Sequence, residues 1–215
     1  MPLIHYIAGP VVCYLLGAAP FGLLAGKMKG VDIRREGSGN IGATNAARVL
    51  GRPWFFVVFA LDFLKGIASV ALIFWLFAGA HGKEIEIGEC NLQVIYGLAA
   101  IAGHMFPVYL GFRGGKGIAV SAGVFAILTP FAFFAAFAVF LLVYLASRYV
   151  SLGSICAAVA FSASYFLFAF LLYRGGPFAP NVVLLSAACV LLTLLVIFKH
   201  RSNIARLLGG KELKV

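Results

Sequence analysis

Apolar runs of 20 residues or more recur along the whole chain, and they constrain its fold more than any other feature. A run of about 20 apolar residues is the length that a helix needs to cross a bilayer. The 215 residues are 63% hydrophobic and 11% charged, whereas a soluble domain has about 25% charged residues. We therefore predict an all-α integral membrane protein. Because the runs leave no room for a soluble part, we expect a single domain over residues 1–215. The runs cover residues 3–26, 54–79, 93–112, 118–147, 149–173 and 177–198.

The fourth run is too long for one crossing. Residues 118–147 carry no charge and as one helix would measure about 45 Å, against about 30 Å for the hydrocarbon core. Thr129-Pro130 lies near its middle, where proline kinks or breaks a helix. The run is therefore one long kinked helix, giving six crossings, or two helices joined at Pro130, giving seven.

The distribution of positive charge favours seven crossings. With seven, the segments 27–53, 113–117, 148 and 199–215 share one side and hold 14 of the 17 Lys and Arg residues. With six, the basic C-terminal segment would lie outside, against the tendency of Lys and Arg to stay in the cytoplasm. We predict seven transmembrane helices, with the N-terminus outside and the C-terminus in the cytoplasm.

The net charge of +10 follows from this topology and from binding of an anionic substrate, because no basic helix or RNA-binding motif indicates a nucleic-acid partner. The sequence has no G-x-S-x-G nucleophile motif and no His/Cys cluster with metal-ligand spacing. We therefore expect neither a metal nor a cofactor.

The first segment with unusual chemistry is REGSGNIGATNAARVLGR, residues 35–52. It is dense in small donors and acceptors, and its glycines let backbone N–H groups approach a ligand. A solvated loop is the alternative interpretation. The residues of this kind in the segment are Gly37, Ser38, Gly39, Asn40, Gly42, Thr44, Asn45 and Arg48.

The second segment is GHMFPVYLGFRGGKG, residues 103–117. Successive backbone N–H groups around Gly114 and Gly115 can form an anion-binding nest before the next helix, and Lys116 adds a point charge. No Ser or Thr follows Lys116, so this is not a nucleotide-binding Walker A loop. A small phosphate is the expected ligand, and a flexible basic turn is the alternative.

The third segment is KHRSNIARLLGG, residues 199–210. His200 and Asn203 are three residues apart and share a face of a helix. An amphipathic anchor on the membrane surface is the alternative. Within the second apolar run, Asp62 and Lys65 are expected to form a structural pair, because ionisable groups at membrane depth are costly unless paired.

Together these segments resemble one family. GSGNIGATNAAR, GHMFPVYLGFRGGKGIA and KHRSNIARLLGGKE are similar, in order and spacing, to three signature motifs of the bacterial acyl-phosphate:glycerol-3-phosphate acyltransferases of the PlsY type. LDFLKG at 61–66 and SLGSI at 151–155 also match. Two departures are small: Lys199 stands where Arg is common, and Gly153 replaces a frequent Ala.

The resemblance implies transfer of a fatty acyl group from acyl phosphate to the 1-hydroxyl of glycerol 3-phosphate, giving lysophosphatidic acid and phosphate. It also implies which residues act. Ser38, Arg48, His200 and Asn203 would be catalytic, Asn40, Thr44, Asn45, Gly114, Gly115, Lys116 and Ser154 would bind substrate, and Glu212 would be a structural tie.

Both proposed substrates carry phosphate, which suits basic segments on the cytoplasmic face, while the acyl chain can lie in membrane lipid. An acyl phosphate already has a good leaving group, so the enzyme needs mainly positioning and charge stabilisation. The donor phosphate is expected to take the hydroxyl proton, with His200 as the alternative base. One chain holds all the motifs, so a monomer should suffice. The other functional class that we weigh is a transporter of a phosphorylated anion, which predicts inverted repeats that the sequence does not show.

Overall fold

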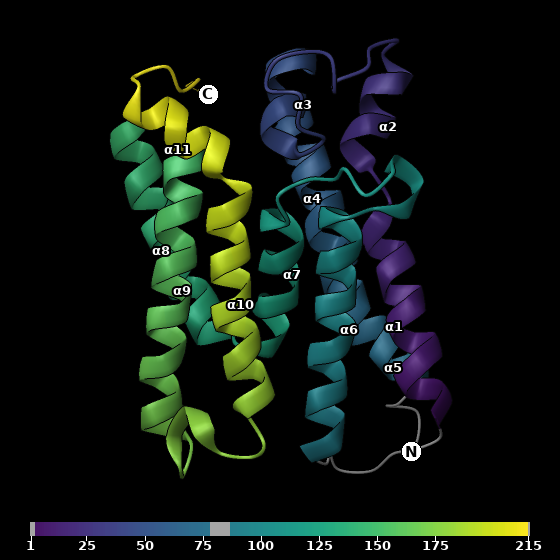
Figure 1. The fold of residues 1–215 in the computed structure, drawn as a ribbon, viewed down its shortest axis with the longest axis vertical. Coiled ribbons are helices and arrows are strands. Elements are labelled where there is room, and N and C mark those ends of the chain that lie inside the picture. The colour runs from purple at the N-terminus through teal and green to yellow at the C-terminus, as the bar shows by residue number, and fades with distance from the viewer. Residues whose placement is uncertain (1–2, 78–86, 215) are drawn as a thin grey trace. The chain divides into compact units, whose positions relative to one another are not determined.

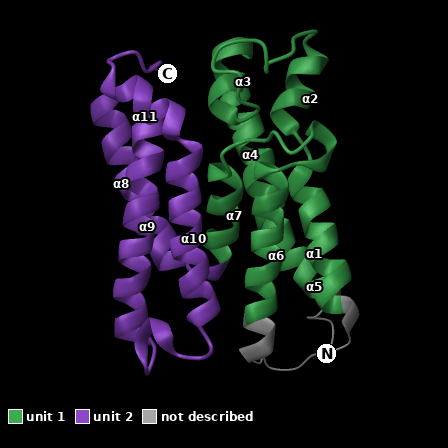
Figure 2. Ribbon diagram, in the orientation of Figure 1, with its two compact units in different colours: residues 1–127 green, residues 128–215 purple. Residues whose placement is uncertain are grey.

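The computed structural model describes residues 3–77 and 87–214, and the described residues are helical with no β-strand. This confirms the prediction of an all-helical chain. The chain divides into two compact units, Met1–Ile127 and Leu128–Val215 (Figure 2).

The first unit holds the helices that position the first two motif segments. Pro53 occupies the first turn of α4, where its missing N–H costs no helical hydrogen bond. A π-helical turn follows α4 and carries the chain into α5. The elements are α1 (Leu3–Ala18), α2 (Phe21–Met28), α3 (Ala43–Leu50), α4 (Pro53–Ala68), the π turn (Ser69–Ile73), α5 (Phe74–Phe77), α6 (Ile87–Met105), a 3-10 turn (Val108–Leu110) and α7 (Ile118–Leu128).

Glycines let the long helices of this unit approach closely. A Cβ on Gly17 of α1 would overlap the backbone of Ala100 on α6, and one on Gly103 of α6 would overlap the backbone of Tyr14. Gly66 of α4 is packed in the same way against α7. Small residues at such contacts are typical of helices packed within a membrane. The packing brings α2, α3 and the loop before α7 to one end of the unit (Figure 1).

The second unit is built from three long antiparallel helices and a short terminal one (Figure 1). Arg148, with φ of 62°, makes the tight turn between the first two. Inside the unit, Ser162 and Thr193 pair at 2.7 Å between α9 and α10, as interhelical hydroxyls do in membrane proteins. The elements are α8 (Pro130–Ser147), α9 (Val150–Leu172), a 3-10 turn (Gly176–Phe178), α10 (Val183–Lys199) and α11 (Arg201–Leu208).

The break predicted at Pro130 is confirmed, because Thr129 separates α7 from α8. Within the described residues, five helical spans are long and apolar enough to cross a membrane, and six if α10 and α11, bent by 54°, count as one. α7 is apolar but has only 11 residues. The number of crossings and the orientation therefore remain predictions.

Candidate functional site

Asn45 of α3 organises the first segment. Its side-chain oxygen accepts hydrogen bonds from the backbone N–H of Ser38 at 2.7 Å and from the Ser38 hydroxyl at 3.1 Å. Its amide nitrogen donates to the carbonyls of Ile33 at 2.8 Å and Glu36 at 3.2 Å. Asn45 is 1% exposed. It thus holds the loop that presents the exposed Ser38, and Gly37, with φ of 59°, lets the loop pass over the amide.

The end of this loop leads directly into α3. The Asn40 side-chain oxygen accepts the Gly42 N–H at 2.9 Å, which forms a local turn before the helix. Thr44 lies in the first turn of α3 and Arg48 in the last, and both are half-buried. The helix therefore carries three of the predicted site residues, Thr44, Asn45 and Arg48, on one short rigid element.

The second segment folds back against the end of α6. The Gly115 N–H donates to the His104 carbonyl at 3.0 Å. A Cβ on Gly114 would overlap that carbonyl and the Pro107 ring, and a Cβ on Gly115 would overlap the His104 imidazole. Glycine is therefore required at both positions for close packing. Lys116 follows, half-buried, just before α7 begins.

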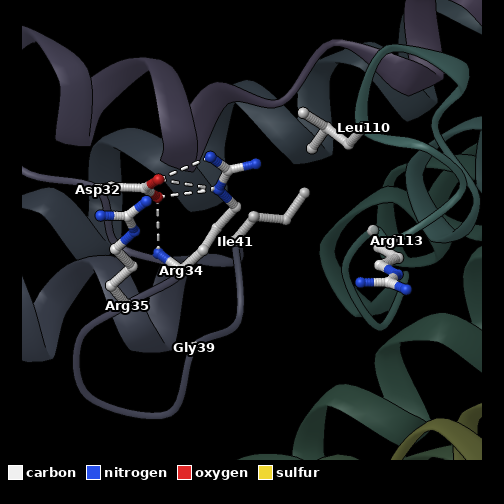
Figure 3. Close-up of a pocket in the computed structure, with 8 residues that line it drawn as sticks. Asp32, Arg34, Arg35, Gly39, Ile41, Leu110 and Arg113 are labelled. Atoms are coloured by element: carbon white, nitrogen blue, oxygen red, sulfur yellow. Dashed lines mark hydrogen bonds and ion pairs between the residues drawn. The ribbon is translucent and has the colours of Figure 1, made fainter.

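The two segments line one cavity of about 520 Å³ (Figure 3). Gly39 and Ile41 come from the first segment, and Leu110, Arg113 and Gly114 from the second. Figure 3 shows Arg113 lying across the cavity from the group formed by the remaining lining residues, Asp32, Arg34 and Arg35.

Asp32, Arg34 and Arg35 were not predicted as site residues, although the DIRR stretch that leads into the first segment was a readable signal. The Asp32 carboxylate accepts hydrogen bonds from the Arg34 side chain, at 2.9 Å from Nε and 2.6 Å from Nη2, and from the Arg34 backbone N–H at 3.0 Å. These hydrogen bonds lower the pKa of Asp32, so the carboxylate is ionised and offsets Arg34. Three arginines and one aspartate leave the cavity lining with a net positive charge, which suits an anionic ligand.

Asp62 and Lys65 form an ion pair at 2.7 Å on α4, with side chains that are 3% and 1% exposed. His104 of α6 joins them, with its Nδ1 3.1 Å from the Lys65 ammonium. The pair was expected from the sequence, but its third member was not, because 39 residues separate Lys65 from His104.

In the second unit, His200 lies at the bend between α10 and α11 and is 2% exposed. Its Nδ1 lies 2.8 Å from the Val196 carbonyl. Because a carbonyl only accepts, Nδ1 carries a hydrogen. The bend therefore sets both the position and the orientation of this histidine ring.

Glu212 ties the C-terminal segment to two helices. It accepts hydrogen bonds from Asn203 at 2.6 Å, Ser151 at 3.0 Å and Arg206 at 2.7 Å. Burial raises the pKa of Glu212, but these bonds outweigh burial and the net shift is downward. Ser151 and Arg206 were not selected from the sequence. Ser154, one turn further along α9, is buried and donates to the Val150 carbonyl at 2.9 Å.

The fold and the site define a class of protein: a helical chain with several membrane-length spans, in which glycine-rich, basic loops at the helix ends form a site for an anion. Comparison with known proteins makes the class specific. The family model described as glycerol-3-phosphate acyltransferase matches residues 7–210. The chain belongs to this family.

Relatives in several bacteria carry the same description. The glycerol-3-phosphate acyltransferase of Trichlorobacter lovleyi is 44% identical over 98% of this chain and 96% of its own length. That of Aquifex aeolicus is 41% identical over 94% and 95%. The resemblance inferred from the motifs is therefore confirmed, and the transporter interpretation gains no support.

Two solved structures share the fold. They are crystal structures of PlsY, an integral membrane glycerol 3-phosphate acyltransferase, in a glycerol 3-phosphate form and a lysophosphatidic acid form. Both are 38% identical to this chain and cover 97% of it and 94% of their own length, with TM-scores of 0.79 and 0.76. The chain is accordingly a multi-pass membrane protein and a glycerol-3-phosphate acyltransferase.

Proposed function

We propose that this protein transfers the acyl group of an acyl phosphate to the 1-hydroxyl of glycerol 3-phosphate. The hydroxyl oxygen bonds to the acyl carbon, the bond from that carbon to the phosphate oxygen breaks, and the hydroxyl proton leaves with the phosphate. The products are 1-acyl-glycerol 3-phosphate and inorganic phosphate. The observation that carries the proposal is the cationic cavity lined jointly by the first two motif segments in a chain of this family.

The acceptor site is assigned to the glycine loop. Gly114 brings its backbone close to the ligand at the cavity, Gly115 keeps the loop against His104, and Lys116 supplies charge to the phosphate. The related PlsY crystal structure in a glycerol 3-phosphate form supports this acceptor.

The reacting groups are assigned to Ser38 and Arg48, with Asn40, Thr44 and Asn45 in support. Asn45 acts by holding the Ser38 loop, as its four hydrogen bonds suggest. This set stabilises charge on the leaving phosphate and needs no covalent intermediate on the protein.

The C-terminal motif is assigned to the same reaction on the basis of its resemblance to the family. His200 and Asn203 would contact substrate, Ser154 would line the substrate path, and Glu212 would hold Asn203 through the 2.6 Å bond. Because an acyl phosphate has a good leaving group, the departing phosphate takes the proton, and His200 orients the substrate. No metal or other cofactor enters this scheme.

We further propose seven crossings in one domain, residues 1–215, with α7 as a short tilted crossing. The C-terminus and the site then lie on the cytoplasmic face of a bacterial inner membrane, where glycerol 3-phosphate is found, and a monomer suffices. Single cysteines replacing Arg35 and Lys211 should react with a membrane-impermeant reagent only from the cytoplasmic side, and one replacing Glu86 only from outside. Labelling of position 211 from outside would contradict the seven-crossing arrangement.

The direct test is an assay of purified protein with palmitoyl phosphate and glycerol 3-phosphate, in which the release of phosphate is measured. Palmitoyl-CoA is tested beside it as the alternative donor. We expect turnover with the acyl phosphate alone and without added metal. Turnover with the thioester and none with acyl phosphate would refute the proposed donor.

A further inference from the structure

The ammonium group of Lys65 joins three segments of the first unit. Its Nζ lies 2.7 Å from the Asp62 carboxylate on the same helix, 2.9 Å from the Ala19 carbonyl between α1 and α2, and 3.1 Å from Nδ1 of His104 on α6. An ammonium has three N–H donors, and two of them meet the Ala19 carbonyl and Nδ1 of His104, while the Asp62 carboxylate pairs with its charge. A cation that is 1% exposed is costly unless it is paired and hydrogen-bonded in this way.

The contact with Lys65 fixes the orientation of the His104 ring. Nδ1 faces the Lys65 ammonium, so Nε2 faces the glycine loop. The Asp62 oxygen is 3.6 Å from Nδ1, which is too far for a good hydrogen bond. Asp62 therefore balances the charge of Lys65, and Lys65 holds the ring of His104.

His104 in turn contacts the glycine loop at two points. Its carbonyl accepts the Gly115 N–H at 3.0 Å. The Nε2 edge of its ring fills the space where a side chain at position 115 would begin. The path of the loop from Gly114 to Lys116 is thus set against this ring, at the edge of the cavity that Gly114 lines.

We propose that Asp62, Lys65 and His104 are positioning residues for the acyl acceptor. They hold the loop Gly114–Lys116 so that Gly114 and the Lys116 side chain face the phosphate of glycerol 3-phosphate. They act through the loop and touch no substrate. The inference rests on the proposed function, which assigns that loop to the acceptor phosphate.

The first test is His104→Asn. Asparagine keeps an acceptor near the Nδ1 position for Lys65 but removes the ring beneath Gly115. We expect the KM for glycerol 3-phosphate to rise about 10–100-fold, the usual loss when a group that orients a ligand is removed, while the KM for acyl phosphate stays unchanged. Ser69→Ala is the matched control, since it removes a buried bond to the Lys65 carbonyl at 2.8 Å and should lower Tm without changing either KM.

The second test uses the overlap at position 115. Gly115→Ala should raise the KM for glycerol 3-phosphate, because the new Cβ meets the His104 ring. In a His104→Ala background the ring is gone, so the same substitution should cost little more. Additive effects of the two substitutions would show that the ring does not set the loop.

Binding of glycerol 3-phosphate to the detergent-solubilised proteins, measured by calorimetry, separates this inference from the proposed reaction. Absence of acyl transfer by the wild type would refute the reaction, while weaker binding by His104→Asn alone would still support the positioning role. The inference is overturned if His104→Asn binds glycerol 3-phosphate as the wild type does, or if it raises both KM values equally.

Discussion

Removing the Asn45 side chain should release the loop that carries Ser38. Asn45→Ala deletes four hydrogen bonds, two accepted from Ser38 and two donated to the Ile33 and Glu36 carbonyls. At about 1 kcal/mol each, four bonds contribute about 4 kcal/mol. Three of the four are only part-buried, so water replaces much of what they supply, and we expect a loss of about 2 kcal/mol in the free energy of opening the loop.

Limited trypsin digestion measures this opening, because Arg34 and Arg35 lie in the loop and are exposed. When opening and closing are fast, the cleavage rate follows the population of the open form, and about 2 kcal/mol corresponds to about 30-fold faster cleavage. The products at these two sites are identified by mass. Acyl transfer should fall in parallel, since Ser38 loses its fixed position.

Two further variants, which remove different hydrogen bonds of the same loop, give cleavage rates for comparison with Asn45→Ala. Asn40→Ala removes one bond, to Gly42, and should accelerate cleavage only severalfold. Asn45→Asp keeps both bonds from Ser38 but places a carboxylate oxygen against two carbonyls, so it should not restore the wild-type rate. Cleavage of Asn45→Ala no faster than that of Asn40→Ala would refute the role of Asn45 as the centre of the loop.

Three other predictions concern charged and titrating groups. Lys116→Ala should raise the KM for glycerol 3-phosphate, because a charge-assisted bond is worth about 1.5–3 kcal/mol, and an unchanged KM would remove Lys116 from the site. Glu212→Gln should lower Tm at neutral pH. Since the pKa of Glu212 is lowered in the folded state, its stabilisation is present above the unfolded value of about 4.3 and is lost as pH falls below it, so the variant should lose less stability on acidification. His200→Gln should keep the acidic limb of the pH–rate profile, because the leaving phosphate takes the proton; a flattened limb would make His200 the base.

The sequence predicted the helical membrane fold for a simple physical reason. A membrane-spanning helix must hydrogen-bond its backbone N–H and C=O groups within itself and expose apolar side chains to lipid. Each span is therefore visible in the sequence as a continuous run of apolar residues. The break at Pro130 is local too, because proline clashes with the preceding turn. The three motif segments were recognisable because glycine and small polar residues cluster there beyond what a connecting loop requires.

For some residues, the sequence shows which amino acid is present but not which groups it contacts. Asn45 was predicted to bind substrate, but its buried amide is occupied by the Ser38 loop. From the sequence, Arg34 and Arg35 were counted only among the positive charges that set the membrane topology, but in the structure they line the cavity. Each role depends on what lies opposite in space, which the local pattern does not contain.

What the sequence by itself determined is therefore the set of apolar spans, the helix break and the position of the chemistry along the chain. Only the tertiary structure decided which side chains act together. His104 meets Lys65 across 39 residues, and Ser151 meets Glu212 across 61. Hydrogen bonds depend on distance and direction, and close packing at glycines sets both, so such partnerships arise only when the helices have packed.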